Sequence, residues 1–327
     1  MARKARATVR AAADKAREAL LASAGKIDSD DDRLGDLVLY DLVPGFRKSV
    51  GAVSKVFEAH GMDPKAVLPM PPDWGVAFGR ALEKVGARIR VQGYKLIPAK
   101  DGPKGERRIA VVAVHANKTV TTDDLATICC PTSKDNKPPF IERGEVRKAR
   151  TLAYEVVKET KGLYEVYTTD DIRVAVVEHI DRWFGLPLRK QPPYVAYWVP
   201  AAGSKEIRNL RAAVEECGAG EIELFTGYGS DRESKRAIVN TVNKGLESQL
   251  NEFKADVQTY LDKDAISTRV STMEELIEES KRLRERAGLY RSILGAAVES
   301  VDSQYKAVEK KVKKHLGIVE DAHAEVA

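Results

Sequence analysis

Residues 273–301 read MEELIEESKRLRERAGLYRSILGAAVESV, and their apolar positions recur at alternating intervals of three and four. This spacing predicts a helix with one buried side. The positions concerned are Met273, Leu276, Leu283, Ala287, Tyr290, Leu294, Ala297 and Val301, with Ser280 at the one polar place in the series. We refer to this series as the seam.

A second apolar stripe at helical spacing lies earlier in the chain. It consists of Val239, Val242, Leu246, Leu250, Phe253, Val257 and Tyr260. Residues 262–271, between the two stripes, contain few apolar side chains. We therefore expect residues 231–317 to form a long antiparallel helical hairpin.

The second helix of this hairpin is predicted to be continuous. Beyond Val301 the apolar residues Tyr305, Val308 and Val312 follow with the phase shifted by one residue, as expected when a straight helix drifts against a seven-residue repeat. At about 1.5 Å per residue the helix would be on the order of 65 Å long. Folding the hairpin about Ser267 places Lys306 near Tyr228.

That fold predicts a basic patch where the hairpin meets the rest of the protein. The patch would combine Arg232, Lys235 and Arg236 with Lys306, Lys310, Lys311, Lys313 and Lys314. Clustered lysines can bind phosphates as point charges. The alternative is structural, because lysines near a helix C-terminus offset the helix dipole and pair with acids one turn earlier, as Lys313 can with Glu309.

Composition limits the class of protein. The chain has 327 residues, of which 43% are hydrophobic, and a formal net charge of +5 with a pI near 8.9. It is long enough for two domains, and mildly basic, which is compatible with nucleic-acid binding but does not establish it. No apolar run approaches the roughly 20 residues that a membrane helix needs, and no secretory signal is visible. We expect a cytoplasmic protein with three reduced cysteines and no contact with a membrane.

The predicted fold class is α+β, with a small mixed sheet and packed helices ahead of the hairpin. We expect strands within 37–42, 89–97, 108–115, 152–156, 163–167, 195–199 and 222–225, and helices within 48–60, 74–85, 170–184 and 204–217. The expected segments are a basic and acidic arm over 1–35, an α+β region over 36–145, a central α+β domain over 146–230, the hairpin over 231–317 and a tail over 318–327.

A second group of cations lies among aromatic residues. Arg182, Arg189 and Lys190 are close in sequence to Trp183, Phe184, Tyr194, Tyr197 and Trp198. Cations could contact phosphates there while rings stack on bases. The alternative is that at least half of the rings belong to the core, because alternation along a strand directs Tyr197 and Trp198 to opposite faces.

Signs of catalysis or of cofactor binding are weak. Thr121–Asp124 and Thr168–Asp171 have the composition of helix N-caps, with paired metal-binding acids as the alternative. The glycines around Gly227 could approach a phosphate or form a tight turn. Cys129 and Cys130 could include a nucleophile or be a structural pair in a turn. The five histidines lack the spacing of metal ligands. We therefore expect no catalytic residue, no metal site and no cofactor.

Several short stretches resemble an uncharacterised family of bacterial and phage-associated proteins. These are Leu68–Pro69 before the helix start at Ala77, Phe78 and Ala81, the segment Thr169–Ile172 with Tyr197, and the late residues Arg286, Ala287, Leu289, Tyr290, Leu294 and Gly295. The resemblance covers most of the chain. It implies a phage or mobile-element setting and carries no known activity to individual positions.

These observations lead to one functional hypothesis and two alternatives. The hypothesis is a non-enzymatic assembly protein that forms homo-oligomers through the hairpin and contacts DNA or RNA through its basic residues. The first alternative is a structural or partner-binding scaffold with solvated lysines. The second is an enzyme whose site is assembled from distant residues, around Cys129, Cys130 or the Gly227 turn.

Overall fold

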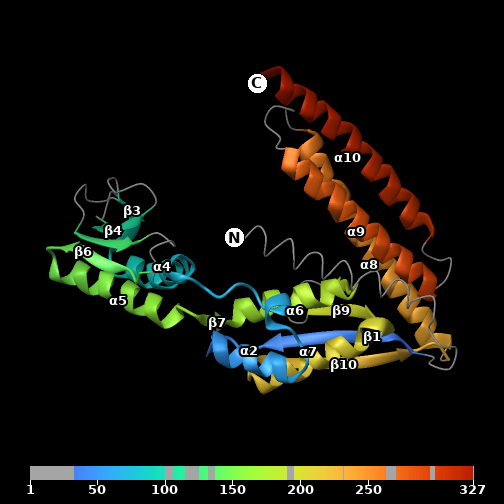
Figure 1. Cartoon of the computed structure of the whole chain (residues 1–327), viewed down its shortest axis with the longest axis horizontal. Coiled ribbons are helices and arrows are strands. Elements are labelled where there is room, and N and C mark those ends of the chain that lie inside the picture. The colour runs from blue at the N-terminus through green and yellow to red at the C-terminus, as the bar shows by residue number, and fades with distance from the viewer. Residues whose placement is uncertain are drawn as a thin grey trace. The chain divides into compact units, whose positions relative to one another are not determined.

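The structure is a computed structural model that describes residues 33–99, 106–114, 125–131, 137–189, 195–230, 232–262, 270–294 and 299–326 (Figure 1). It confirms the α+β class. Its strands are β1 (Arg33–Leu42), β2 (Arg47–Ser49), β3 (Tyr94–Pro98), β4 (Arg107–Ala113), β5 (Ala126–Cys130), β6 (Phe140–Gly144), β7 (Val166–Thr168), β8 (Leu186–Arg189), β9 (Val195–Pro200) and β10 (Gly220–Tyr228). Its helices are α2 (Val50–Ala59), α3 (Pro64–Val67), α4 (Trp74–Val91), α5 (Arg147–Leu163), α6 (Thr169–Arg182), α7 (Ser204–Glu216), α8 (Arg232–Leu261), α9 (Val270–Leu294) and α10 (Glu299–Val326).

The chain divides into two compact units. The first unit contains residues up to 42, residues 60–62 and residues 175–327, and the second contains residues 43–59 and 63–174. The division does not follow chain order, because β1 belongs with the C-terminal half. The predicted boundary between residues 145 and 146 lies inside the second unit. The predicted arm lies almost wholly outside the described residues.

The sheet of the first unit has the strand order β10-β1-β9-β8. Each described strand pair is antiparallel, including Leu37 opposite Trp198, where the sequence predicts a mixed sheet. Trp198 joins the hydrophobic core that the sheet shares with α8, α9 and α10. The hydroxyl of Tyr290 on α9 donates to the backbone oxygens of Phe184 at 3.0 Å and Trp198 at 2.9 Å. Sheet and helices are thus joined by apolar packing and by directional bonds.

The described residues of the C-terminal region form three helices, so the prediction of one unbroken second helix is wrong. The described part of the seam ends with α9 at Leu294, and α10 begins at Glu299. Ala297 and the side chain of Val301 lie outside the described residues. Arg286 on α9 donates to Gln249 on α8 at 3.2 Å, which is the register expected for a fold about Ser267. Arg284 then pairs with Glu309 on α10 at 2.7 Å. The chain therefore reverses twice, and α10 runs in the same direction as α8 (Figure 1).

The phase shift beyond Val301 has a different cause from the one predicted. Tyr305, Val308 and Val312 are buried in the core that contains the α9 seam. They form the apolar face of a separate helix, so they need not continue the phase of the seam. The shift marks the second reversal of the chain and not the gradual drift of a straight helix.

The second unit contains a sheet with the strand order β3-β4-β5-β6 and the short pair β2-β7. Helices α4 and α5 form one apolar core with β4 and β5. Two predictions are wrong here: residues 152–156 lie in α5 and not in a strand, and Ile89 and Val91 end α4. The buried residues of α5 are Ala149, Leu152, Ala153, Val156, Val157, Thr160 and Leu163, a helical series that includes two small alanines.

The predicted helix start at Thr168–Asp171 is confirmed. The Asp171 carboxylate accepts from the Thr168 backbone N–H at 2.8 Å and from its hydroxyl at 2.9 Å, which satisfies a free donor of the first turn of α6. Arg80 binds the same carboxylate through two nitrogens at 2.7 and 2.6 Å. Asp171 therefore caps the helix, whereas Asp170 pairs with Arg173 on the helix surface. The similar stretch Thr121–Asp124 lies outside the described residues.

Candidate functional site

The structure separates the two halves of the predicted basic patch. Arg232, Lys235 and Arg236 are exposed on the first turns of α8. Lys306 follows Tyr305, whose ring lies 6.5 Å from that of Phe253, and Gln304 accepts a hydrogen bond from Lys254 at 2.7 Å. Lys306 thus lies beside the second half of α8, about 25 Å along the helix from Arg236, and the other lysines of α10 lie farther along. The predicted position of Lys306 near Tyr228 is wrong, because it assumed one reversal instead of two.

The lysines of α10 nevertheless form a group of their own. Lys306, Lys310, Lys311, Lys313 and Lys314 are all exposed and fall within nine consecutive residues. The one acid in this interval, Glu309, is buried and is held by Lys313 at 2.6 Å and Arg284 at 2.7 Å. The hydrogen bond from Lys313, with that from Arg284, lowers the pKa of Glu309 although burial opposes its ionisation. The structural pairing expected for Lys313 is therefore present.

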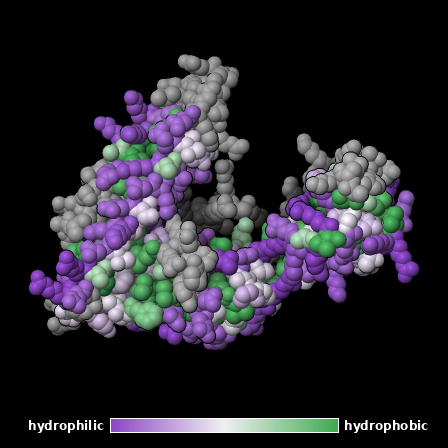
Figure 2. Space-filling view, turned by 180° about the vertical axis from the view of Figure 1, so that it is seen from behind, coloured by the Kyte–Doolittle hydropathy of each residue, from purple (hydrophilic) through white to green (hydrophobic). Residues whose placement is uncertain are grey.

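Three lysines of this group have no such role. Within the described part of the chain, no ion pair involves Lys310, Lys311 or Lys314. Figure 2 shows hydrophilic side chains over most of the visible face of the C-terminal helices. We refer to the five lysines as the α10 lysine face.

The second predicted group is only partly visible in the structure. Arg182 is half-buried at the end of α6 and interacts with other residues. Lys190 and the side chain of Arg189 lie outside the described residues. Phe184, Tyr197 and Trp198 are 3%, 9% and 4% exposed, so these rings belong to the core, as in the alternative. A surface where bases stack on them is excluded.

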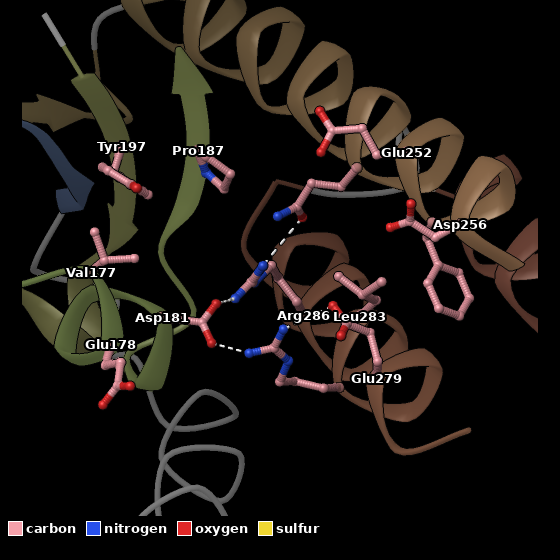
Figure 3. A pocket seen from close by; sticks show the side chains of 13 residues that line it. Val177, Glu178, Asp181, Pro187, Tyr197, Glu252, Asp256, Glu279, Leu283 and Arg286 are labelled. Atoms are coloured by element: carbon pink, nitrogen blue, oxygen red, sulfur yellow. Dashed lines mark hydrogen bonds and ion pairs between the residues drawn. The ribbon is translucent and has the colours of Figure 1, made fainter. Parts of the chain in front are cut away.

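Sequence reasoning missed a cavity in the first unit. It has a volume of about 400 Å³ and is lined by residues of α6, β8, β9, α8 and α9 (Figure 3). At its centre the Asp181 carboxylate is bound by the guanidinium groups of both Arg282 and Arg286. Arg286 is 1% exposed, whereas Asp181 and Arg282 are 31% and 41% exposed. No motif indicates this contact, because its partners are separated by 105 residues in the sequence.

The cavity carries an excess of negative charge. Five carboxylates line it, those of Glu178, Asp181, Glu252, Asp256 and Glu279, against the guanidinium groups of Arg282 and Arg286. Glu279 pairs with Arg282 at 3.0 Å. The side chains that line the cavity thus form a network of ion pairs, which fixes α9 to the end of α6. Among the described residues, no group of three or more His, Cys, Asp or Glu side chains could hold a metal ion.

The candidate nucleophiles are not activated. Cys129 and Cys130 lie in β5, and not in a turn as predicted, with 0% and 2% exposed. Burial raises the pKa of Cys129 to about 11 and also raises the pKa of Cys130. Both thiols are therefore protonated at neutral pH, whereas the thiolate is the nucleophile.

One of the five histidines and the glycine of the predicted turn both have structural explanations. His179 is 3% exposed, and burial lowers its pKa to about 3, so it is a neutral core residue. Gly227 lies against the ring of Trp198 and the side chain of Ile238, where a Cβ atom would come within 2.8 and 2.6 Å of them. Close packing explains this glycine without a phosphate.

The comparisons with known proteins identify one family and no function. A family model described as a family of unknown function, DUF6744, matches residues 33–321. This match confirms the predicted resemblance to an uncharacterised family. No curated protein and no solved structure matches the chain. As for membranes, no helix among the described residues is both long and apolar enough to span one.

Proposed function

We propose that this chain, which belongs to the DUF6744 family of unknown function, is a non-enzymatic protein that binds nucleic acid through the α10 lysine face. The observation that carries the proposal is five exposed lysines within nine residues, whose one intervening acid is buried and already paired. Within the described part of the chain, no ion pair cancels the charges of Lys310, Lys311 and Lys314. Lysines arranged in this way bind phosphates through charge and counterion release, without reading base sequence.

The three C-terminal helices act as the scaffold for this surface. Val308 and Val312 are buried against α8 and α9, so the apolar side of α10 is fixed in the core of the first unit. The lysines between them point away from that core. A rigid helix of this kind holds its cations in place before binding, which reduces the entropy lost when phosphates are bound.

Self-association stays a prediction, but its basis changes. The seam residues Met273, Leu283, Ala287, Tyr290 and Leu294 are buried within a single chain. They are not available as the open edge of a coiled coil between two chains. A homo-oligomer would need another surface, and the proposal of nucleic-acid binding does not depend on one. The phage-associated setting likewise stays a prediction.

A pair of charge-matched variants tests the proposal. The first replaces Lys310, Lys311 and Lys314 by Gln, and the control replaces the exposed lysines Lys55, Lys65 and Lys205 by Gln. Both lower the net charge by three. Binding of a fluorescent DNA duplex is measured by anisotropy over a range of salt concentrations. Each lost phosphate contact reduces the magnitude of the slope of log K against log salt by about 0.9. We therefore expect this slope to decrease in magnitude by about 2 to 3 in the first variant and to change little in the control.

Two results would contradict the proposal. One is the absence of duplex binding by the wild-type chain at about 50 mM salt, where charge-driven binding is strong. The other is an equal loss of slope in both variants, which would mean that net charge matters and the position of the lysines does not. Circular dichroism of both variants checks that these exposed substitutions leave the fold unchanged.

A further inference from the structure

The second unit has a groove that none of the predicted residues occupies. It lies between the strand β6 and the helix α5, which are adjacent in the structure (Figure 1). Its volume is about 430 Å³. Strand β6 is an edge of its sheet in the described part of the chain, so the groove is open along one side.

Two aromatic rings border this groove and are poorly buried. Phe140 at the start of β6 is 48% exposed, and Tyr154 in the middle of α5 is 62% exposed. The neighbouring residues Leu152, Ala153 and Val156 of α5 are in the core, so α5 is already anchored without Tyr154. Exposed rings that the fold does not require are available to stack on a ligand.

The polar lining of the groove is mainly cationic. Arg143, Arg150 and Lys161 line it, and no ion pair within the described chain involves any of the three. The one acid in the lining, Glu142, pairs with Arg108 at 3.1 Å. The groove therefore offers three uncompensated positive charges beside two rings.

A glycine positions one of these cations. A Cβ atom on Gly144 would lie 3.2 Å from Cβ, 3.1 Å from Cγ and 3.3 Å from Cδ of Arg150. The aliphatic part of Arg150 therefore packs closely on the backbone at the end of β6. This contact restricts the side chain and keeps its guanidinium group at the groove.

We infer that the groove of β6 and α5 binds a segment of single-stranded nucleic acid. Unpaired bases can stack on Phe140 and Tyr154 while Arg143, Arg150 and Lys161 contact the phosphates, which is how sequence-independent single-strand binding works. In a duplex the base faces are covered by their neighbours, so the rings would gain nothing. The inference rests on the proposed function, because it names the form of nucleic acid, but it uses different residues in the other unit.

Ring and charge variants of the full chain test this inference. Anisotropy is measured with labelled oligothymidylate and oligouridylate and with a duplex of the same length. Phe140→Ala with Tyr154→Ala should weaken single-strand binding by about 5- to 140-fold for each stacked base that is lost, and leave duplex binding unchanged. The matched control is Phe225→Ala, which removes a ring that is 54% exposed in the first unit and should have no effect.

The cations are tested in the same assay. Arg143→Gln with Arg150→Gln should lower the salt slope for the single strand by about 0.7 per contact. The control Arg208→Gln removes an exposed arginine on α7 and should not change it. If polyglutamate of equal charge competes as well as oligothymidylate, the groove binds acidic chains by charge alone and the inference is overturned.

The outcomes separate this inference from the proposed function. Single-strand binding that is lost in the ring variant supports the groove, and duplex binding that the α10 variant keeps counts against the α10 lysine face. Duplex binding that is lost in the α10 variant, together with single-strand binding that the ring variant keeps, overturns the groove alone. A wild-type chain that binds neither form overturns both.

Discussion

The cores of the two units differ in the kind of contact that holds them. In the second unit, α4 and α5 pack on the sheet through residues such as Val85, Ile128 and Val156, all 0% exposed. In the first unit, charged and polar side chains are buried as well, several of them beside the apolar seam. They include Arg286 at 1% exposed, Glu309 at 6%, His179 at 3% and Ser280 at 0%.

This difference affects what each unit tolerates. An apolar core accepts side chains of similar volume, because dispersion and burial have no fixed direction. A buried charge needs its partner at a particular position, since a lost partner leaves an uncompensated charge. The first unit should therefore respond strongly to removal of single buried polar groups, whereas the core that α4 and α5 form in the second unit should respond mainly to changes in volume.

The largest effect is expected at Arg286. Its replacement by Ala removes a buried contact to Asp181 and Gln249 and leaves a cavity beside the seam. We expect the free energy of unfolding of the first unit to fall by about 3 kcal/mol. Urea denaturation followed by circular dichroism measures this.

Arg282→Ala is the matched control for this prediction. Arg282 binds the same carboxylate but is 41% exposed, so its loss should cost no more than about 1 kcal/mol. Equal effects of the two substitutions would show that burial of the ion pair is not what stabilises α9, and the contrast between the two cores would lose its main support.

A smaller effect, dependent on pH, is expected at His179. Burial lowers its folded pKa to about 3 from an ordinary value of 6.5, so the unfolded chain binds a proton between these pH values and the folded chain does not. Stability is then lost as pH falls below about 6.5, by about 2 kcal/mol at pH 5. His179→Leu cannot take up a proton.

Comparing the pH dependence of unfolding in two proteins separates the effect of His179 from that of the other titratable groups. Wild type and His179→Leu are unfolded in urea at several pH values from 7 to 4, and the free energies are subtracted. The wild type should lose stability faster on acidification. Parallel profiles would mean that His179 is solvated or protonated in the folded state, contrary to its burial.

Much of the first unit follows from short-range pattern. Helices α6 and α7 and strands β9 and β10 were predicted close to their observed bounds, and the Arg286–Gln249 contact agrees with a hairpin folded about Ser267. Each of these elements has a clear apolar period. The reversal between α9 and α10 was missed because residues 295–298 read GAAV, in which two alanines favour helix and no proline ends it.

The errors in the second unit have another physical cause. In α5, Leu152, Tyr154 and Val156 alternate as in a strand, but Tyr154 is exposed and Ala153 is buried. A small alanine carries little weight in a count of apolar residues, yet it allows α5 to pack closely on the sheet. Sequence alone could not identify the β6–α5 groove either, because it depends on the pairing of β5 with β6, which brings the edge strand beside the helix.

The smallest effect is expected from Ile128→Leu in the second unit. Ile128 in β5 is 0% exposed and packs among side chains of α4 and α5, and leucine keeps its volume and has no polar group. The free energy of unfolding, measured in urea, should fall by less than about 1.5 kcal/mol, and this difference from the wild type should not depend on pH between 7 and 4. Ile128→Ala, which removes volume, should cost about 2 to 5 kcal/mol. If leucine were as damaging as alanine, shape and not volume would limit this core, and the second unit would be as specific as the first.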